Sequence, residues 1–153
     1  VSGLDDLAKG GFQNLIPDST CKDAKKARRV VVCGGKVYYD LVEAAAAKKV
    51  KDVAIVRVEQ LYPFPRALLA EELKRFGAAK EVVWCQEEPM NQGAWYQIRH
   101  HLDFCLAKGQ SLSYAGRSRS ASPAAGHLNT HNAEQAQLIE DALVSAPNTH
   151  TAE

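Results

Sequence analysis

Short apolar runs alternate along the chain with longer stretches in which apolar residues recur every three or four positions. The runs are rich in Val, Ile and Cys, which is typical of strands covered on both faces. They predict strands over residues 29–33, 53–58 and 82–85, followed by a shorter strand over 111–114. The recurring positions predict helices over 38–49, 69–76, 95–105 and 136–143. Because strands that alternate with helices of crossover length form parallel sheets, we predict a three-layer α/β/α sandwich with a mostly parallel sheet.

The two ends of the chain lack this alternation. We interpret residues 1–28 as an entry segment, with a short helix over 4–7, a short strand over 12–16 and a polar, Lys-rich solvated connection over 18–28. The α/β domain is expected at 29–144, including a long ordered loop over 115–130. A tail is expected at 145–153.

Composition is that of an ordinary globular domain. Of 153 residues, 46% are hydrophobic and 24% are charged, which excludes wholesale disorder and a disulfide-stapled miniprotein. The 19 Lys and Arg against 18 Asp and Glu give a net charge of +1, so no global field attracts nucleic acid or an acidic membrane surface. No apolar run approaches the ~20 residues of a membrane span. The chain opens on Val1 without a signal segment or an initiator methionine, and we expect it to be a fragment.

The four cysteines, Cys21, Cys33, Cys85 and Cys105, do not have the spacing of a metal site. No CxxC is present and no His lies at zinc-finger distance. Cys33 and Cys85 each end a predicted strand, and we interpret them as small buried hydrophobic residues. Since nothing indicates a secretory context that would favour disulfides, we expect a reducing compartment.

The first turn between a predicted strand and helix reads Cys33-Gly34-Gly35-Lys36-Val37. Ligands of parallel sheets bind at the carboxyl ends of strands. This turn, however, has neither the spacing and hydroxyl of a phosphate loop nor the three glycines of a dinucleotide fingerprint. Two interpretations stay open for Lys36: a weak anion site at a helix N-terminus, or a tight turn with a solvated side chain.

Other residue types that carry catalysis are poorly arranged. Glu87 and Glu88 are adjacent, so on an extended chain they point in opposite directions and cannot act together on one substrate. We expect one of them, or Asn91, to cap or anchor the following helix. His100 and His101 lie about 100° apart on a helix, which is poor geometry for joint metal binding. The histidines are therefore expected on the surface or at an interface.

The loop after the last predicted strand carries basic and hydroxyl residues in alternation: Arg117, Ser118, Arg119 and Ser120. No GxSxG elbow surrounds the serines. Two interpretations remain: capture of a phosphate or carboxylate, or docking of a basic loop on another subunit. Residue chemistry alone thus predicts a domain without a self-sufficient active site, as an enzyme assembled from several domains would contain.

Four stretches together resemble one protein family. They read GKVYYDL (35–41), VAIVRVEQLYPFP (53–65), WCQEEPMNQGAW (84–95) and YAGRSRSASPAAG (114–126). In order and spacing they are similar to the C-terminal domain of the E1 component of 2-oxoglutarate dehydrogenase, over residues 30–143. The resemblance implies the transketolase C-terminal fold, a five-stranded mixed sheet whose first strand, with 12–16 as candidate, runs antiparallel to the others.

The resemblance also implies an activity for the whole enzyme. The family depends on thiamine diphosphate and magnesium, decarboxylates 2-oxoglutarate in the citric acid cycle, and passes the succinyl group to lipoyl arms of the E2 succinyltransferase. The implied partners are the remaining E1 domains, a second E1 subunit in a homodimer, and E2. Because this chain lacks the GDG-type magnesium and diphosphate motif of the preceding domains, we expect it to bind no cofactor and to be inactive alone. A location in the bacterial cytoplasm is expected in preference to the mitochondrial matrix.

A regulatory ligand is a further implication, because related E1 proteins bind acetyl-CoA or AMP on this domain. The matching basic positions are Lys36, Arg57, Arg117 and Arg119, with Ser120 supplying a hydroxyl. Anionic phosphates need such cationic partners, so we expect an allosteric and assembly domain of an E1 subunit. The alternative is a free-standing nucleotide-binding regulatory module of the same fold, which the start at Val1 disfavours.

Overall fold

The strands form one sheet in the order β1-β3-β2-β4-β5 in the computed structural model, which describes residues 4–145 (for residues 6 and 7, the backbone only). β1 (Leu15–Ile16) pairs antiparallel with β3 (Val53–Val58), and the remaining neighbours pair in parallel: β2 (Arg29–Cys33), β4 (Glu81–Cys85) and β5 (Ser111–Ala115). The predicted α/β class and the five-stranded, mostly parallel sheet are confirmed. Residues 146–153 of the predicted tail lie outside the described residues.

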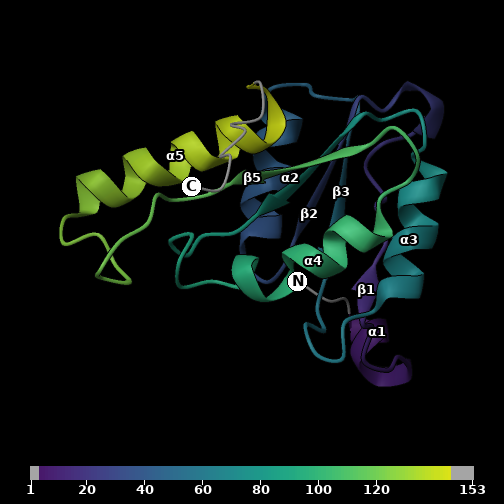
Figure 1. Ribbon diagram of the computed structural model, residues 1–153, viewed down its shortest axis with the longest axis horizontal. Helices are drawn as coiled ribbons and strands as arrows, with labels where there is room; N and C mark the ends of the chain where they lie inside the picture. Colours follow the sequence, from purple (N-terminus) through teal and green to yellow (C-terminus); the bar gives the residue numbers. More distant parts are fainter. Residues whose placement is uncertain (1–3, 146–153) are drawn as a thin grey trace.

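Helices cover both faces of the sheet (Figure 1). α2 (Val37–Ala47) and α5 (Leu128–Leu143) pack on one face, and α3 (Arg66–Arg75) and α4 (Trp95–Cys105) pack on the other. α1 (Leu4–Lys9) and a 3-10 turn (Ala24–Lys26) belong to the segment that leads into the sheet. The predicted three layers are therefore present.

Each central strand contributes to both hydrophobic cores, because successive side chains of a strand point to opposite faces. In β2, Val30 and Val32 pack in the core beneath α3 and α4, whereas Val31 and Cys33 pack in the core beneath α2 and α5. All four side chains are fully buried. Two covered faces explain why the strands are continuous apolar runs in the sequence.

Cys33 and Cys85 are register partners on β2 and β4 and are both fully buried. Burial raises the pKa of the Cys33 thiol to about 12 and raises the pKa of Cys85 well above its usual range. Both thiols stay protonated near neutral pH. The interpretation of these residues as small buried hydrophobic residues is confirmed.

Most of the segment over 18–28 is exposed, as its polar composition predicts, but Asp18 is an exception. Asp18 is buried, and its carboxylate accepts hydrogen bonds from the backbone N–H of Ile55 (2.8 Å), the backbone N–H of Cys21 (2.8 Å) and the hydroxyl of Thr20 (2.6 Å). A buried carboxylate needs such donors because it has lost its hydration. Asp18 therefore fastens the entry segment to β3.

Two predicted boundaries also change. The strand predicted over 12–16 is limited to Leu15–Ile16. α5 begins at Leu128 rather than near 136, so the loop after β5 ends at 127. The first two turns of α5 are largely exposed and carry no apolar stripe from which a helix could be predicted.

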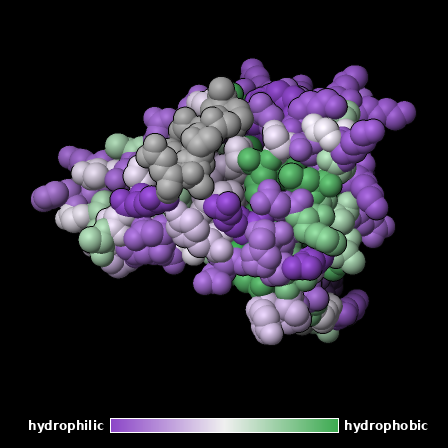
Figure 2. Space-filling model, in the orientation of Figure 1, coloured by the Kyte–Doolittle hydropathy of each residue, from purple (hydrophilic) through white to green (hydrophobic). Residues whose placement is uncertain are grey.

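Hydrophobic and hydrophilic residues are unevenly distributed over the face of the molecule shown in Figure 2. On the face shown in Figure 2, hydrophobic residues gather where β5 and α4 lie in Figure 1. The end of the molecule formed by the start of α5 and its preceding loop is largely hydrophilic. The loop that carries Arg117 and Arg119 runs from β5 to the start of α5.

A histidine joins α3 to α4. His101 accepts at Nδ1 from the guanidinium of Arg66, with Nε at 2.9 Å and Nη2 at 2.5 Å. The imidazole stacks on Phe64 with ring centroids 5.0 Å apart, and the ring of His100 lies 3.9 Å away. A ring nitrogen that accepts from a guanidinium must be unprotonated. Burial, followed by the neighbouring His100 and Arg66, lowers the pKa of His101.

We predict that the free energy of unfolding decreases as the pH falls below about 6.5, the ordinary pKa of histidine. In that range the unfolded chain binds a proton at His101 that the native state resists, so stability is present at higher pH and is lost on acidification. His101→Asn keeps an acceptor near the position of Nδ1 but cannot titrate, and should flatten this part of the profile in urea unfolding between about pH 8 and about pH 5. His127→Asn, at the exposed start of α5, is the matched control. A profile in His101→Asn as steep as in the wild type would contradict the prediction.

Candidate functional site

Three connections meet where parallel strands end (Figure 1). The turn 34–36 follows β2, the loop 86–94 follows β4, and the loop 116–127 follows β5. The first half of α5 continues from the last of these loops. We call this region the carboxyl edge. Ligands of open parallel sheets bind at such an edge, and four of the five predicted site residues lie on these connections.

Gln86 organises the loop after β4. Its Oε1 accepts from the indole N–H of Trp84 (2.9 Å) and from the backbone N–H of Trp95 (3.0 Å). Its Nε2 donates to the backbone carbonyls of Glu88 (3.1 Å) and Pro89 (3.2 Å). The side chain is buried with every polar atom paired. Gln86 thus holds the loop after β4 in place through two of the loop's own carbonyls, and it links the end of β4 to the first residue of α4.

Two glycines allow this close packing. A Cβ atom at Gly93 would collide with the side-chain amide of Gln86, and one at Gly116 would collide with the phenol of Tyr114. The Tyr114 hydroxyl donates to the backbone carbonyls of Arg117 (3.3 Å) and Glu88 (3.4 Å). Burial raises the pKa of Tyr114 well above its usual range, so it remains a donor. The loops after β4 and β5 are therefore braced against each other.

The predicted helix cap is wrong. α4 begins after Ala94 with no side-chain cap, and the Gln86 amide takes the role of accepting its first N–H. Glu87 instead lies 3.2 Å from Nζ of Lys36. Asn91 is turned toward the loop after β5, where it pairs with the backbone of Ser120. These side chains cross-link loops, a function that their spacing along the chain could not indicate.

Lys36 is engaged at the carboxyl edge and is not an isolated solvated side chain. Its Nζ lies 3.0 Å from Asp40 and 3.2 Å from Glu87. The bonds to Asp40 and then Glu87 raise the pKa of Lys36. With 68% of its side chain exposed, Lys36 can still meet a ligand from solution, but only in competition with two carboxylates.

Gln135 on α5 connects Lys36 to the loop after β5, a role that sequence reasoning missed. Its Nε2 donates to Asp40 (2.9 Å) and to Glu87 (3.0 Å), the two acids that bind Lys36. Its Oε1 accepts from Nη2 of Arg117 at 3.3 Å. One amide therefore brings two of the predicted site residues into a single polar network.

Arg117 is the most buried of the predicted cations, with 8% of its side chain exposed. Nη2 contacts Nδ1 of His131 at 2.9 Å as well as Gln135. Nε lies 3.5 Å from Oε2 of Glu134. Three side chains from the first half of α5 thus surround one guanidinium.

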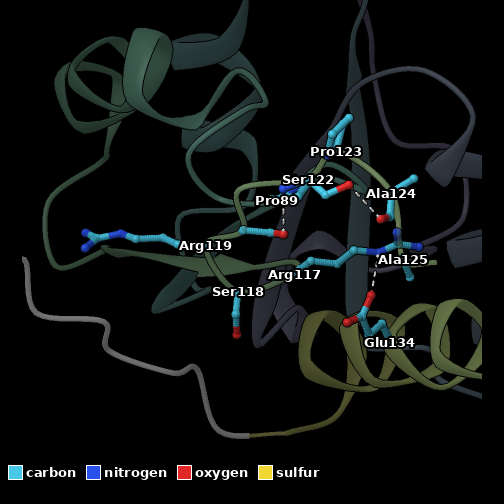
Figure 3. Close-up of a pocket in the computed structure, with 10 residues that line it drawn as sticks. Pro89, Arg117, Ser118, Arg119, Ser122, Pro123, Ala124, Ala125 and Glu134 are labelled. Atoms are coloured by element: carbon cyan, nitrogen blue, oxygen red, sulfur yellow. Dashed lines mark hydrogen bonds and ion pairs between the residues drawn. The ribbon is translucent and has the colours of Figure 1, made fainter. Parts of the chain in front are cut away.

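Arg119 does not converge with Arg117. Figure 3 shows the two side chains extending in opposite directions. Arg119 donates to the hydroxyl of Tyr96 from Nε (3.1 Å) and Nη2 (2.8 Å). The Ser120 backbone is held by Asn91, and its Oγ accepts from the backbone N–H of Ser122 at 3.1 Å.

Arg117, Arg119 and Ser120 nevertheless line one hollow, of about 190 Å³ (Figure 3). Pro89 and Glu134 also line it, as do small residues of the loop over 118–125. Cationic, hydroxyl and backbone groups around an open hollow are suited to an oxyanion. The sequence left two interpretations open for the basic loop: anion capture, or docking on another subunit. The geometry of the hollow is compatible with anion capture.

Arg57 lies apart from this hollow. It stands near the end of β3, with Nε 3.0 Å from Glu59 and Nη1 donating to the hydroxyl of Tyr39 at 3.0 Å. The guanidinium also lies over the ring of Tyr38, 4.8 Å from its centroid. Its contacts are therefore with Glu59, just after β3, and with the first turn of α2. The five predicted residues divide into a group around Arg117, a neighbouring Lys36, and a separate Arg57.

Among residues 4–145, no three His, Cys, Asp or Glu side chains gather in a way that could hold a metal ion. In the same part of the chain, no helix combines the length and apolar character required to cross a membrane.

Comparison with known proteins decides the family. A family model described as 2-oxoglutarate dehydrogenase C-terminal matches residues 1–143. The chain belongs to the 2-oxoglutarate dehydrogenase C-terminal family. This result agrees with the resemblance carried by the four motifs.

Two curated relatives of this 2-oxoglutarate dehydrogenase C-terminal domain are described as E1 components. The chain is 51% identical over 143 residues to the 2-oxoglutarate dehydrogenase E1 component of Cupriavidus necator, and 50% identical over 143 residues to that of Haemophilus influenzae. Each match covers 94% of this chain and 15% of the relative. The chain thus spans about 15% of the length of these relatives.

A solved structure supports the fold. A protein described as a split gene transketolase, inactive beta4 tetramer, superposes with a TM-score of 0.59 at 16% identity, covering 86% of this chain and 43% of that one. At this identity the likeness concerns the fold alone. The 2-oxoglutarate dehydrogenase C-terminal domain therefore has a transketolase C-terminal-like structure.

We predict that Gln86→Ala lowers the free energy of unfolding by about 2–4 kcal/mol, because it leaves buried donors on Trp84 and Trp95 unpaired and opens a void. Urea denaturation followed by circular dichroism measures the change. Gln97→Ala, at an exposed position of α4, is the matched control and should stay within about 0.5 kcal/mol of the wild type. Equal stability of the two variants would show that Gln86 does not organise the loop.

Proposed function

We propose that this chain serves a 2-oxoglutarate dehydrogenase E1 subunit as an assembly and effector-binding domain, and not as its catalytic centre. The observation that carries the proposal is the family match over residues 1–143, in a chain that spans about 15% of its E1 relatives. The site geometry adds an oxyanion-compatible hollow at the carboxyl edge. The activity of the whole enzyme then requires the parts of E1 that this chain does not contain.

Thiamine diphosphate and magnesium are assigned to those other parts of E1. Mg²⁺ and its diphosphate are held chiefly through carboxylates that stay available to the metal. At the carboxyl edge the two central carboxylates, Asp40 and Glu87, are taken by Lys36 and Gln135. The residues present therefore do not fit a magnesium–diphosphate site. We propose that the chain alone neither binds the cofactor nor turns over 2-oxoglutarate.

The proposed biological setting follows from the relatives. The whole enzyme would decarboxylate 2-oxoglutarate oxidatively and pass the succinyl group to lipoyl groups of E2, within the citric acid cycle. This domain would contact the remaining E1 domains and, through them, a second subunit of the E1 homodimer. The relatives named above are bacterial, which supports the bacterial cytoplasm as its location.

The proposed effector is acetyl-CoA or AMP, bound by its phosphates at the hollow around Arg117. A guanidinium forms strong, directional bonds to phosphate oxygens. Arg119 and Ser120 line the same hollow, and Lys36 is joined to Arg117 through Gln135. Arg57 is proposed as an outer contact only, because its bonds are with Tyr39 and Glu59. An effector in the hollow would act on α5, which supplies three of the groups around Arg117.

We predict that acetyl-CoA or AMP binds the 153-residue chain saturably in calorimetric titration, and that Arg117→Ala weakens binding by roughly 10- to 100-fold. The estimate corresponds to the loss of about 1.5–3 kcal/mol of charge-assisted hydrogen bonding. Arg99→Ala, on α4, is the matched control for the loss of one cation and should bind like the wild type. Absence of binding by both ligands, or an affinity in Arg117→Ala equal to that of the wild type, would refute an effector site at the hollow.

A further inference from the structure

Arg117 carries a buried donor that its surroundings do not satisfy. Its side chain is only 8% exposed, and within the described chain Nε is buried without a hydrogen-bond partner. Buried donors are almost always paired in proteins, and an unpaired donor on a charged group is especially unfavourable. Nε is therefore the atom of this site with most to gain from an incoming oxygen.

Glu134 faces this edge of the guanidinium from α5. Its Oε2 lies 3.5 Å from Nε, whereas charge-assisted N–H···O bonds measure about 2.7–2.9 Å. The contact neutralises the charge of Arg117 but does not satisfy its donor. The side chain of Glu134 is 43% exposed, so its carboxylate can rotate into solvent without losing a buried environment.

The nitrogen next to Nε on the same edge of the guanidinium, Nη2, is held by two side chains of α5. Nη2 contacts His131 at 2.9 Å and Gln135 at 3.3 Å. These contacts keep the plane of Arg117 in place if Glu134 moves. Gln135 is itself fixed by Asp40 and Glu87, so the guanidinium is preorganised by residues of two other elements.

Both Arg117 and Glu134 line the hollow of about 190 Å³ (Figure 3). A water molecule takes up about 30 Å³ in the liquid, so the hollow has room for a group of several heavy atoms. An oxyanion that enters it reaches Nε from the side on which Glu134 now lies. The oxyanion and the glutamate cannot both occupy that position.

We propose that Glu134 is a built-in competitor for the anion that Arg117 binds. This inference rests on the effector function proposed above. In the free domain the carboxylate of Glu134 neutralises Arg117 at a long distance. A phosphate or carboxylate group that enters the hollow displaces it, forms the short bond to Nε that the glutamate does not form, and frees Glu134 to solvent. Glu134 thereby raises the anion concentration at which the site fills.

Lys36 differs from Arg117 in this respect. Its two carboxylates lie at 3.0 and 3.2 Å, and most of its side chain is exposed. It has no buried, unpaired donor that an external anion would relieve. Among the cations joined by Gln135, the competition therefore concerns Arg117 and not Lys36; Arg57, whose Nε is also unpaired, does not line the hollow.

The test is calorimetric titration of the 153-residue chain with inorganic pyrophosphate. Glu134→Gln preserves the size of the side chain and removes its charge, and should tighten binding by roughly two- to fivefold, in keeping with the strength of a partly exposed ion pair. Glu71→Gln, at an exposed position of α3, is the matched control for the change in net charge and should bind like the wild type. Circular dichroism verifies that each variant is folded.

The double variant Glu134→Gln/Arg117→Ala separates the local effect from a general one. The proposal predicts that the double variant loses the gain, because the competitor acts only through Arg117. Affinity in Glu134→Gln equal to that in Glu71→Gln, with wild-type binding still dependent on Arg117, would overturn the competitor and leave the effector site intact. A folded wild type and a folded Glu134→Gln that both fail to bind pyrophosphate would overturn the effector site as well.

Discussion

A buried guanidinium at the start of the central strand holds the sheet and the last helix together. Arg29 is 1% exposed; Nε donates to Glu81 at 2.7 Å, and the other nitrogens donate to carbonyls in and just after the last turn of α5: Asp141 (3.0 Å), Ala142 (2.9 Å) and Ser145 (2.5 Å). The carbonyls of Asp141 and Ala142 are among those that a helix leaves unpaired, and they lie at the negative end of its dipole. Arg29 thus binds both the first residue of β4 and the C-terminal end of α5.

This anchor determines what the other end of α5 can do. The buried residues of α5 are Leu138, Ala142 and Leu143, all in its second half. Glu134 lies nine residues before Leu143, or about 14 Å along the helix axis. The first half of α5 therefore extends over the carboxyl edge while its second half is fixed at the amino edge. Its polar side chains can meet ligand without being required for the packing of the core.

The elements that bury apolar side chains could be predicted from the sequence. The strands over 29–33 and 53–58 match the structure because a strand covered on both faces must be continuously apolar. The start of α5 could not be predicted, since its exposed first turns place no apolar residue in the core. Its helical character depends instead on the docking of the later turns through Arg29.

Much of the candidate site could not be predicted from the sequence, for a related reason. Gln86 and Gln135 act through amides that satisfy partners far away in the chain, and no spacing or periodicity marks such a residue. The charge pattern correctly singled out Arg117 and Arg119 on one loop, yet it could not show that their side chains diverge. That divergence follows from Tyr96 on one side and from α5 on the other. Asp18 was predicted to be exposed to solvent. Polar composition does not distinguish a hydrated carboxylate from one that accepts hydrogen bonds from buried backbone N–H groups.

The proposed effector function requires this domain to bind anions at the carboxyl edge and to respond through the first half of α5. Amide hydrogen exchange of the 153-residue chain, with and without saturating acetyl-CoA, tests it most directly. With acetyl-CoA bound, we expect slower amide exchange over 116–127 and 128–135, and unchanged exchange in the anchored second half of α5. Protection confined to other segments, or exchange unchanged throughout at saturation, would contradict it.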